Sequence, residues 1–213
     1  MKTQIILQND PDTRRCVLDA IRNGKVVALP TDTVYGIACA VDNPRAIAQM
    51  YSIKERDALK AIPVLIGDFN QLAHIAAEFN SKAKLITEHF WPGALTVVVS
   101  KNPALPQELT MYPTVGIRMP DYGWLLDLMR ACGPLAATSA NLSGAASPTS
   151  AQEVLAQLEG RIDLIVDGGT CAGGIPSTVI DCSREPVEIL REGGISSASI
   201  FELINKQSSI GEK

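Results

Sequence analysis

The chain has 213 residues, 46% of them hydrophobic and 20% charged, and a formal net charge of −4. This composition is ordinary for a globular protein with one large domain or two small ones. The acidic pI of about 5.2 argues against a globally basic nucleic-acid binder, since neutralising phosphates needs an excess of Lys and Arg.

Helical spacings alternate with short apolar runs along the whole chain. The first helix is predicted over residues 13–23, where apolar residues recur at helical spacing before Gly24. The same signals predict helices over residues 44–51, 81–90, 124–132, 150–160 and 197–205. A capping box at 150–153 begins the helix predicted over 150–160. Buried strands are predicted at 26–29, 64–66, 95–99, 115–119, 135–138, 162–166, 178–180 and 187–190.

This order of elements predicts an α/β fold. No repeat, low-complexity segment or linker divides the chain, so we expect one domain over residues 1–205 and a polar tail over 206–213. No P-loop and no GxGxxG turn follows a strand, which disfavours a P-loop NTPase or a Rossmann dinucleotide enzyme.

Five cysteines, an odd number without a CxxC spacing, favour reduced thiols over disulfides or a zinc site. The first residues lack the hydrophobic region of a signal peptide. No apolar run approaches the ~20 residues that span a bilayer. We therefore expect a cytoplasmic protein without a membrane anchor.

Two polar segments stand near the first predicted strands. Residues 30–36 (PTDTVYG) follow a buried strand directly, where open α/β sheets place ligands; the alternative is a turn in which Asp and Thr bond nearby backbone. Lys54, Arg56 and Lys60 combine ammonium and guanidinium groups, a mixture suited to triphosphates. The alternative here is a solvated charged loop.

The strand at 114–119 has two different faces, because strand side chains alternate. Val115, Ile117 and Met119 share one face, presented to the core, while Thr114, Gly116 and Arg118 share the other. This second face carries a hydroxyl, a glycine without a side chain and a guanidinium, which together suit the binding of a carboxylate or a phosphate. A half-exposed strand with an incidental Arg explains the same pattern.

Two further segments are rich in small hydroxyl residues. Residues 137–149 contain TSANLSG and SPT after a buried strand, and small residues there let backbone N–H groups approach phosphates. Residues 173–181 (GGIPSTVID) precede REGG at 191–194. Capping serines and a glycine hairpin are the alternatives. His74 and His89 have no acidic or Cys partner at ligand spacing, and Ser139 has no base near it in sequence, so a metal site and a serine hydrolase are disfavoured.

Taken in order, PTDTVYG, KxR, WPG, TVGIRMP, TSANLSG with SPT, GGIPSTVID and ILREGG resemble the YrdC-like family over roughly residues 13 to 195. The resemblance implies a twisted mixed open sheet flanked by helices, with a deep concave cleft. It also implies a threonylcarbamoyl-AMP synthase, a nucleotidyltransferase that joins L-threonine, bicarbonate or CO2 and ATP and releases pyrophosphate. Its product serves threonylcarbamoyladenosine modification at position 37 of tRNA, and a separate transferase complex performs that step.

Motif matching implies the site residues as well. Threonine would be held by Thr33, Arg118, Ala137 and Ser177. ATP, with Mg2+, would be held by Lys54, Arg56, Lys60, Thr114, Ser139, Asn141, Ser147 and Arg191. Lys54 and Arg56 are the expected catalytic residues, and no protein metal ligands are expected.

The chain departs from the family pattern between residues 54 and 65. Asp57 stands where many members have Pro, Ala61-Ile62 replaces Pro-Leu, and Leu65 stands where some members have a ligand-contacting His. Long members of the family also carry a C-terminal domain, which we do not expect in this chain.

Two rival functions remain open at this point. One is a YrdC-like paralogue that acts on a different carbamoyl or amino-acid substrate. The other is a non-catalytic binder of double-stranded RNA or tRNA, which the acidic pI and the 5% aromatic content disfavour.

Overall fold

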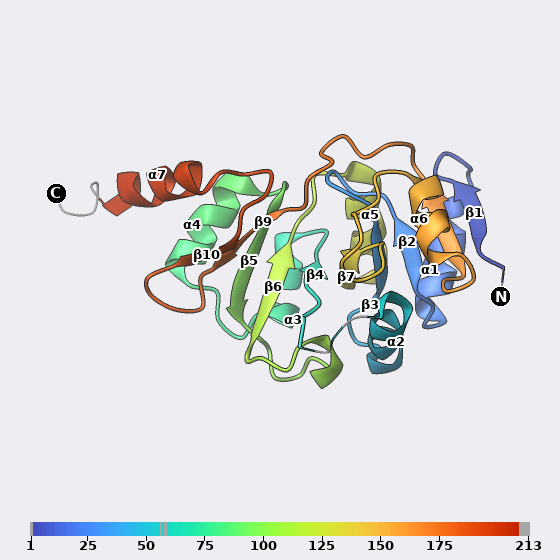
Figure 1. Cartoon of the computed structure of the whole chain (residues 1–213). Coiled ribbons are helices and arrows are strands. Elements are labelled where there is room, and N and C mark those ends of the chain that lie inside the picture. The colour runs from blue at the N-terminus through green and yellow to red at the C-terminus, as the bar shows by residue number, and fades with distance from the viewer. Residues whose placement is uncertain (1, 56, 58, 209–213) are drawn as a thin grey trace.

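The computed structural model describes residues 2–55, 57 and 59–208. Within these residues ten strands form one sheet in the order β1-β8-β2-β3-β7-β4-β6-β5-β9-β10. Figure 1 shows the sheet twisting along the molecule, with β1 and β10 at opposite ends and helices packed around it. The expected α/β class and the twisted mixed sheet flanked by helices are confirmed.

Neighbouring strands pair in both directions. The parallel pairs are β1/β8, β2/β8, β4/β6 and β5/β9, and the remaining neighbours are antiparallel. The strands are β1 (Gln4–Leu7), β2 (Val27–Leu29), β3 (Gly36–Ala40), β4 (Val64–Leu65), β5 (Leu95–Ser100), β6 (Thr114–Arg118), β7 (Leu135–Ser139), β8 (Leu164–Asp167), β9 (Thr178–Asp181) and β10 (Glu188–Arg191).

The helices are α1 (Thr13–Arg22), α2 (Pro44–Lys54), α3 (Leu72–Ile75), α4 (Ser81–Phe90), α5 (Gly123–Cys132), α6 (Ala151–Leu158) and α7 (Ser197–Ser208), with short 3-10 turns at Phe69–Gln71 and Gln107–Leu109. All helices in the described residues except the short α3 follow the predicted ranges closely, and α3 was not predicted. None of these helices, in the part of the chain described, is both long and apolar enough to cross a membrane.

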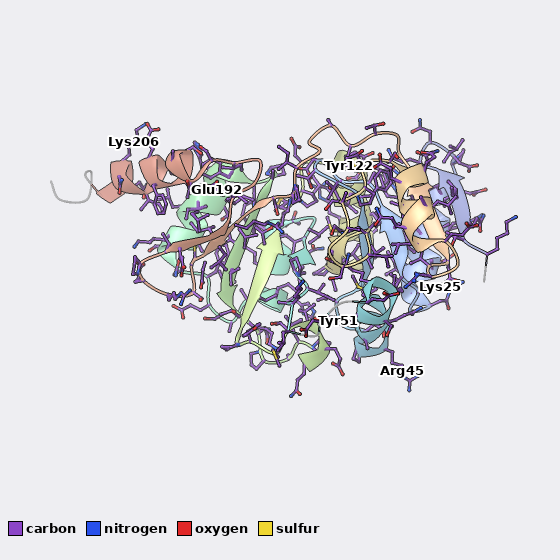
Figure 2. The ribbon with its side chains drawn as sticks, in the orientation of Figure 1. Lys25, Arg45, Tyr51, Tyr122, Glu192 and Lys206 are labelled. Atoms are coloured by element: carbon purple, nitrogen blue, oxygen red, sulfur yellow. The ribbon has the colours of Figure 1, made fainter. Side chains whose placement is uncertain are left out.

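Local sequence explains where the helices begin and which face they bury. In α1 the buried residues Thr13, Val17 and Ile21 recur every four positions, so one stripe faces the core. The side chain of Ser150 caps α6 by accepting from the Glu153 backbone N–H at 3.3 Å, as the capping box predicts. The outer faces are polar: Figure 2 shows Arg45 of α2 and Lys206 of α7 extending away from the body.

Two strands and part of one helix depart from the predictions. The apolar run of the β1 edge strand (QIIL) is too short to predict a strand. β3 (GIACA) consists largely of residues with low strand propensity, so its sequence does not predict a strand either. Pairing with both β2 and β7 makes β3 a strand. Helix α7 reaches Ser208, so the first part of the expected polar tail is helical.

Candidate active site

A cavity of about 360 Å³ lies over a continuous run of strands from β3 to β10 in the sheet order. Its lining alternates with the core along β6: Gly116 and Arg118 face the cavity, while Val115 and Ile117 are buried. The predicted two-faced strand is therefore found as expected, because the strand period of two fixes which residues share a face.

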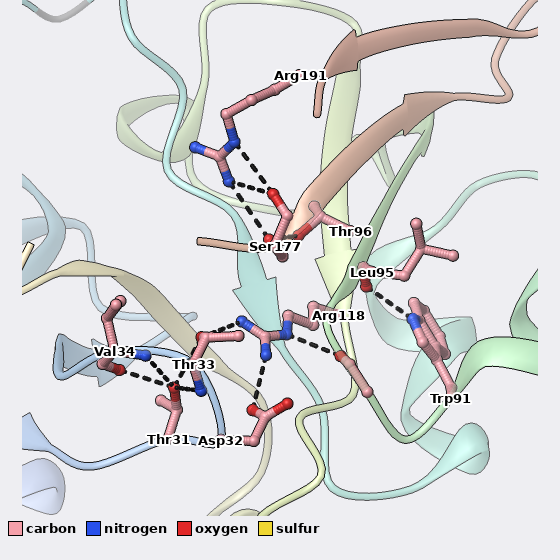
Figure 3. Close-up of polar contacts among 11 residues, drawn as sticks. Thr31, Asp32, Thr33, Val34, Trp91, Leu95, Thr96, Arg118, Ser177 and Arg191 are labelled. Atoms are coloured by element: carbon pink, nitrogen blue, oxygen red, sulfur yellow. Dashed lines mark hydrogen bonds and ion pairs between the residues drawn. The ribbon is translucent and has the colours of Figure 1, made fainter. Parts of the chain in front are cut away.

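Arg118 is held from three sides at one end of the cavity (Figure 3). Its Nε donates to the Gly93 carbonyl at 2.9 Å, Nη1 donates to Thr33 Oγ1 at 2.9 Å, and Nη2 pairs with Asp32 Oδ1 at 2.6 Å. Among the described residues these bonds use three of the five guanidinium N–H groups, so one on each terminal nitrogen is left for a ligand.

The charge of Arg118 is buried, since only 6% of the residue is exposed. Burial lowers the pKa of Arg118, while the Asp32 carboxylate opposes this shift. A buried guanidinium keeps its charge at acceptable cost only when it is paired and hydrogen-bonded. Asp32 therefore stabilises the cation that a ligand carboxylate would meet.

The turn that carries Asp32 and Thr33 is fixed by Thr31. The Thr31 hydroxyl donates to the Val34 carbonyl at 2.7 Å and accepts from the backbone N–H groups of Thr33 and Val34. The interpretation of this segment as a hydroxyl-bonded turn is thus correct for Thr31. Thr33 differs, because its hydroxyl accepts from Arg118 and lines the cavity.

A second polar group lies where β9 and β10 reach the cavity. Arg191 donates from Nε and Nη2 to the Ser177 carbonyl, at 3.1 Å and 2.8 Å, and Nη2 also approaches Ser177 Oγ at 3.3 Å (Figure 3). A Cβ on Gly193 would lie 2.4 Å or less from the backbone of 176–178, so only glycine allows this close approach. Nη1 of Arg191 is left for a ligand among the described residues.

The loop after β7 is anchored from behind by Lys54, which is 1% exposed at the end of α2. Its ammonium donates to the Ser139 carbonyl, to the Asn141 carbonyl at 2.5 Å and to Asn141 Oδ1 at 3.1 Å. Ser139 also donates to Asn141 Oδ1, and Asn141 Nδ2 donates to the carbonyls of Leu142 and Ala145. These contacts present Ser139 to the cavity and hold the loop in shape.

The structure brings most of the predicted site residues together. The cavity is lined by Thr33, Arg118, Ala137, Ser139, Ser147, Ser177 and Arg191. Lys54 and Asn141 lie directly behind Ser139, Thr114 begins β6 outside the lining, and Lys60 is exposed before β4. Arg56 lies outside the described residues.

The departures between residues 54 and 65 have local explanations. Asp57 stabilises a turn, because its carboxylate accepts from the Leu59 backbone N–H at 2.9 Å and its carbonyl accepts from Lys60. Ala61 and Leu65 both line the cavity, while Ile62 is fully buried in the core. The small and apolar replacements thus form part of the cavity wall.

Two residues of the site were not predicted, because no sequence pattern assigns a role to either of them. Thr96 on β5 lines the cavity beside Ser177, with their hydroxyl oxygens 2.8 Å apart. Gly93 offers its carbonyl to Arg118 because Trp91 Nε1 donates to the Leu95 carbonyl at 2.8 Å and anchors the turn between them. The period of β5 places Thr96 and Val98 on one face, but says nothing of which face meets a ligand.

Comparison with known proteins gives the context of this site. The Sua5/YciO/YrdC family model, described as telomere recombination, matches residues 19–193. The chain belongs to the Sua5/YciO/YrdC family. Its relatives include the threonylcarbamoyl-AMP synthase of Bacillus subtilis, 41% identical over 205 residues, which cover 95% of this chain and 59% of the relative.

Solved structures of Sua5/YciO/YrdC proteins share the fold. The Pyrococcus abyssi Sua5 structure complexed with L-threonine has a TM-score of 0.91 and 37% identity, covering 95% of this chain and 61% of that one. Escherichia coli YciO has a TM-score of 0.81 and 25% identity, covering 93% of this chain and 99% of that one. This chain therefore spans less than two thirds of the Bacillus and Pyrococcus proteins.

Proposed function

We propose that the chain is a threonylcarbamoyl-AMP synthase, which forms threonylcarbamoyl-AMP and pyrophosphate from L-threonine, bicarbonate or CO2, and ATP. One observation carries the proposal: residues expected for threonine and residues expected for ATP line a single cavity. Relatives that bear this name, and a structural relative complexed with L-threonine, support it.

The threonine end of the cavity is built on Arg118. Its two remaining N–H groups suit a carboxylate, and hydrogen bonds to charged groups are the strong ones. Thr33 holds the guanidinium in place, and Ala137 and Ser177 complete the walls of this subsite.

The ATP end follows the loop after β7 and the end of β10. Ser139, Ser147 and Nη1 of Arg191 face the cavity as phosphate ligands, and Asn141 shapes the loop. Because Ser139 donates its proton to Asn141, its hydroxyl must turn to donate to a phosphate. Arg56, Lys60 and Thr114 complete this set. Lys54 belongs to the proposed charge-stabilising pair with Arg56, but it acts from behind the loop, because its ammonium donates to Ser139 and Asn141.

The reaction needs little acid–base help. The threonine amine adds to CO2 and loses a proton, and an oxygen of the resulting carbamate bonds to the α-phosphorus as the bond to pyrophosphate breaks. Catalysis consists of positioning and of stabilising charge on the phosphates. Because carbamates and acyl adenylates hydrolyse readily, the cavity must also exclude water.

Mg2+ belongs to the proposal as the companion of ATP. The described residues contain no group of three or more His, Cys, Asp or Glu side chains that could hold a metal ion. The carboxylate of Asp32, at the threonine end of the cavity, is paired with Arg118. The ion would therefore be carried by the phosphates, where it neutralises their charge.

The remaining parts of the proposal concern the cell. We place the protein in the cytoplasm, which suits its five free cysteines. Its product would pass to a tRNA threonylcarbamoyl transferase complex, with direct tRNA binding disfavoured by the net charge of −4.

Mass spectrometry after incubation with ATP, L-threonine and bicarbonate tests the function. We expect threonylcarbamoyl-AMP and an equal amount of pyrophosphate, both dependent on threonine. Replacing threonine by other amino acids, or by carbamoyl phosphate, separates a synthase from a paralogue with a different substrate. Pyrophosphate release with another amino acid but not with threonine would refute the assignment.

A further inference from the structure

A buried pair of hydroxyl groups lies in the wall of the cavity. Thr96 is 4% exposed and Ser177 is 5% exposed, and their oxygens are 2.8 Å apart. Both residues line the cavity: Thr96 lies on β5 and Ser177 immediately precedes β9, and these two strands pair in parallel. A buried hydroxyl in a cavity wall costs free energy unless its hydrogen-bonding capacity is used.

Gly116 of β6 determines how Thr96 is turned. A Cβ on Gly116 would lie 3.0 Å from the Thr96 Cγ2 methyl, so that methyl fills the space left by the missing side chain. Because β-branched residues have few allowed rotamers, placing the methyl also places the hydroxyl. The Thr96 hydroxyl therefore points at Ser177.

Counting donors and acceptors shows what the pair can still bind. Two hydroxyls supply two hydrogens and four lone pairs, and their mutual bond uses one of each. Nη2 of Arg191 occupies a further lone pair on Ser177. Among the described residues one hydrogen and two lone pairs remain, which matches a partner that both donates and accepts. A hydroxyl does both, whereas a methyl group does neither.

We propose that Thr96 is a specificity-determining residue: together with Ser177 it binds the side-chain hydroxyl of the amino-acid substrate and selects a β-hydroxy amino acid over its deoxy analogue. Arg118 holds the carboxylate in the same cavity, so the substrate is bound at both ends. The inference rests on the proposed synthase function and assigns a task to a residue outside the set expected from the sequence motifs.

The test compares kcat/KM for L-threonine with kcat/KM for L-2-aminobutyrate, which lacks only the hydroxyl. A site built to bind a hydroxyl rejects such an analogue strongly, and we expect a wild-type preference on the order of 10²-fold or more. In Thr96→Val the preference should fall about tenfold, because the reaction with threonine slows and that with aminobutyrate does not. Thr96→Ser keeps the hydroxyl and should keep most of the preference.

Thr87→Val is the matched control. Thr87 is fully buried on α4, where its hydroxyl donates to the Ala83 carbonyl at 2.9 Å, and it lies outside the cavity lining. This variant removes a buried hydroxyl without touching the site, so its preference should equal that of the wild type.

The outcomes separate this inference from the proposed function. An equal loss with both substrates, or an unchanged preference in Thr96→Val, overturns the role of Thr96 while leaving the synthase intact. If the wild type makes product from both amino acids equally well, the role of Thr96 is likewise overturned and the synthase function stands. A wild type that makes no adenylate from threonine refutes the function, and this inference with it.

Discussion

Replacing Arg118 by lysine is expected to raise the KM for threonine about 10²-fold, since charged hydrogen bonds contribute about 1.5–3 kcal/mol each. Lysine keeps the positive charge but cannot make the contacts to Gly93, Thr33 and Asp32 and also hold a carboxylate with two parallel N–H groups. The KM for ATP should change little, because Arg118 lies at the amino-acid end. Steady-state pyrophosphate release at varied threonine and ATP measures both constants.

Arg130→Lys is the control for this substitution. Arg130 is exposed on α5, paired with Asp127 at 2.9 Å, and outside the cavity lining. Exposed pairs of this kind contribute about 0–1 kcal/mol, so neither constant should move. An unchanged threonine KM in Arg118→Lys would remove Arg118 from the carboxylate subsite.

Replacing Lys54 by methionine is expected to lower the free energy of unfolding by about 3 kcal/mol, because two backbone carbonyls and an amide oxygen lose a buried donor. The loop that presents Ser139 loses its anchor at the same time. We therefore expect kcat/KM for ATP to fall by about 10²-fold or more, the scale seen when a preorganised donor is removed. Chemical denaturation and pyrophosphate release measure the two effects.

Lys101→Met provides the comparison. Lys101 is half-buried after β5 and donates to the Thr110 carbonyl at 3.0 Å, away from the cavity lining. A single neutral acceptor is affected, so the loss of stability should be about 1 kcal/mol and ATP use should not change. If Lys54→Met were as mild as Lys101→Met in both measurements, the anchoring role would be wrong.

The sequence predicted the architecture well wherever a local period or a cap was present. The alternation along β6 correctly separated Gly116 and Arg118 from Val115 and Ile117, and the capping box at Ser150 correctly began α6. It failed at β3, which is a strand because of its neighbours and not because of its residues.

The partners of the site residues lie beyond what local sequence can give. Lys54 and Ser139 are 85 positions apart, and Asp32 and Arg118 are 86 positions apart. Periodicity and spacing describe one element at a time, whereas these contacts depend on the order of strands in the sheet. Motif resemblance identified residues that gather at the cavity, but it could not show that Lys54 approaches from behind the loop.

The central claim is that threonine and ATP lie side by side in one cavity, and a crystal structure with L-threonine and a non-hydrolysable ATP analogue tests it most directly. We expect the threonine carboxylate on Arg118 and the phosphates beside Ser139 and Arg191. Either ligand bound outside this cavity, or threonine turned with its carboxylate away from Arg118, would contradict the account.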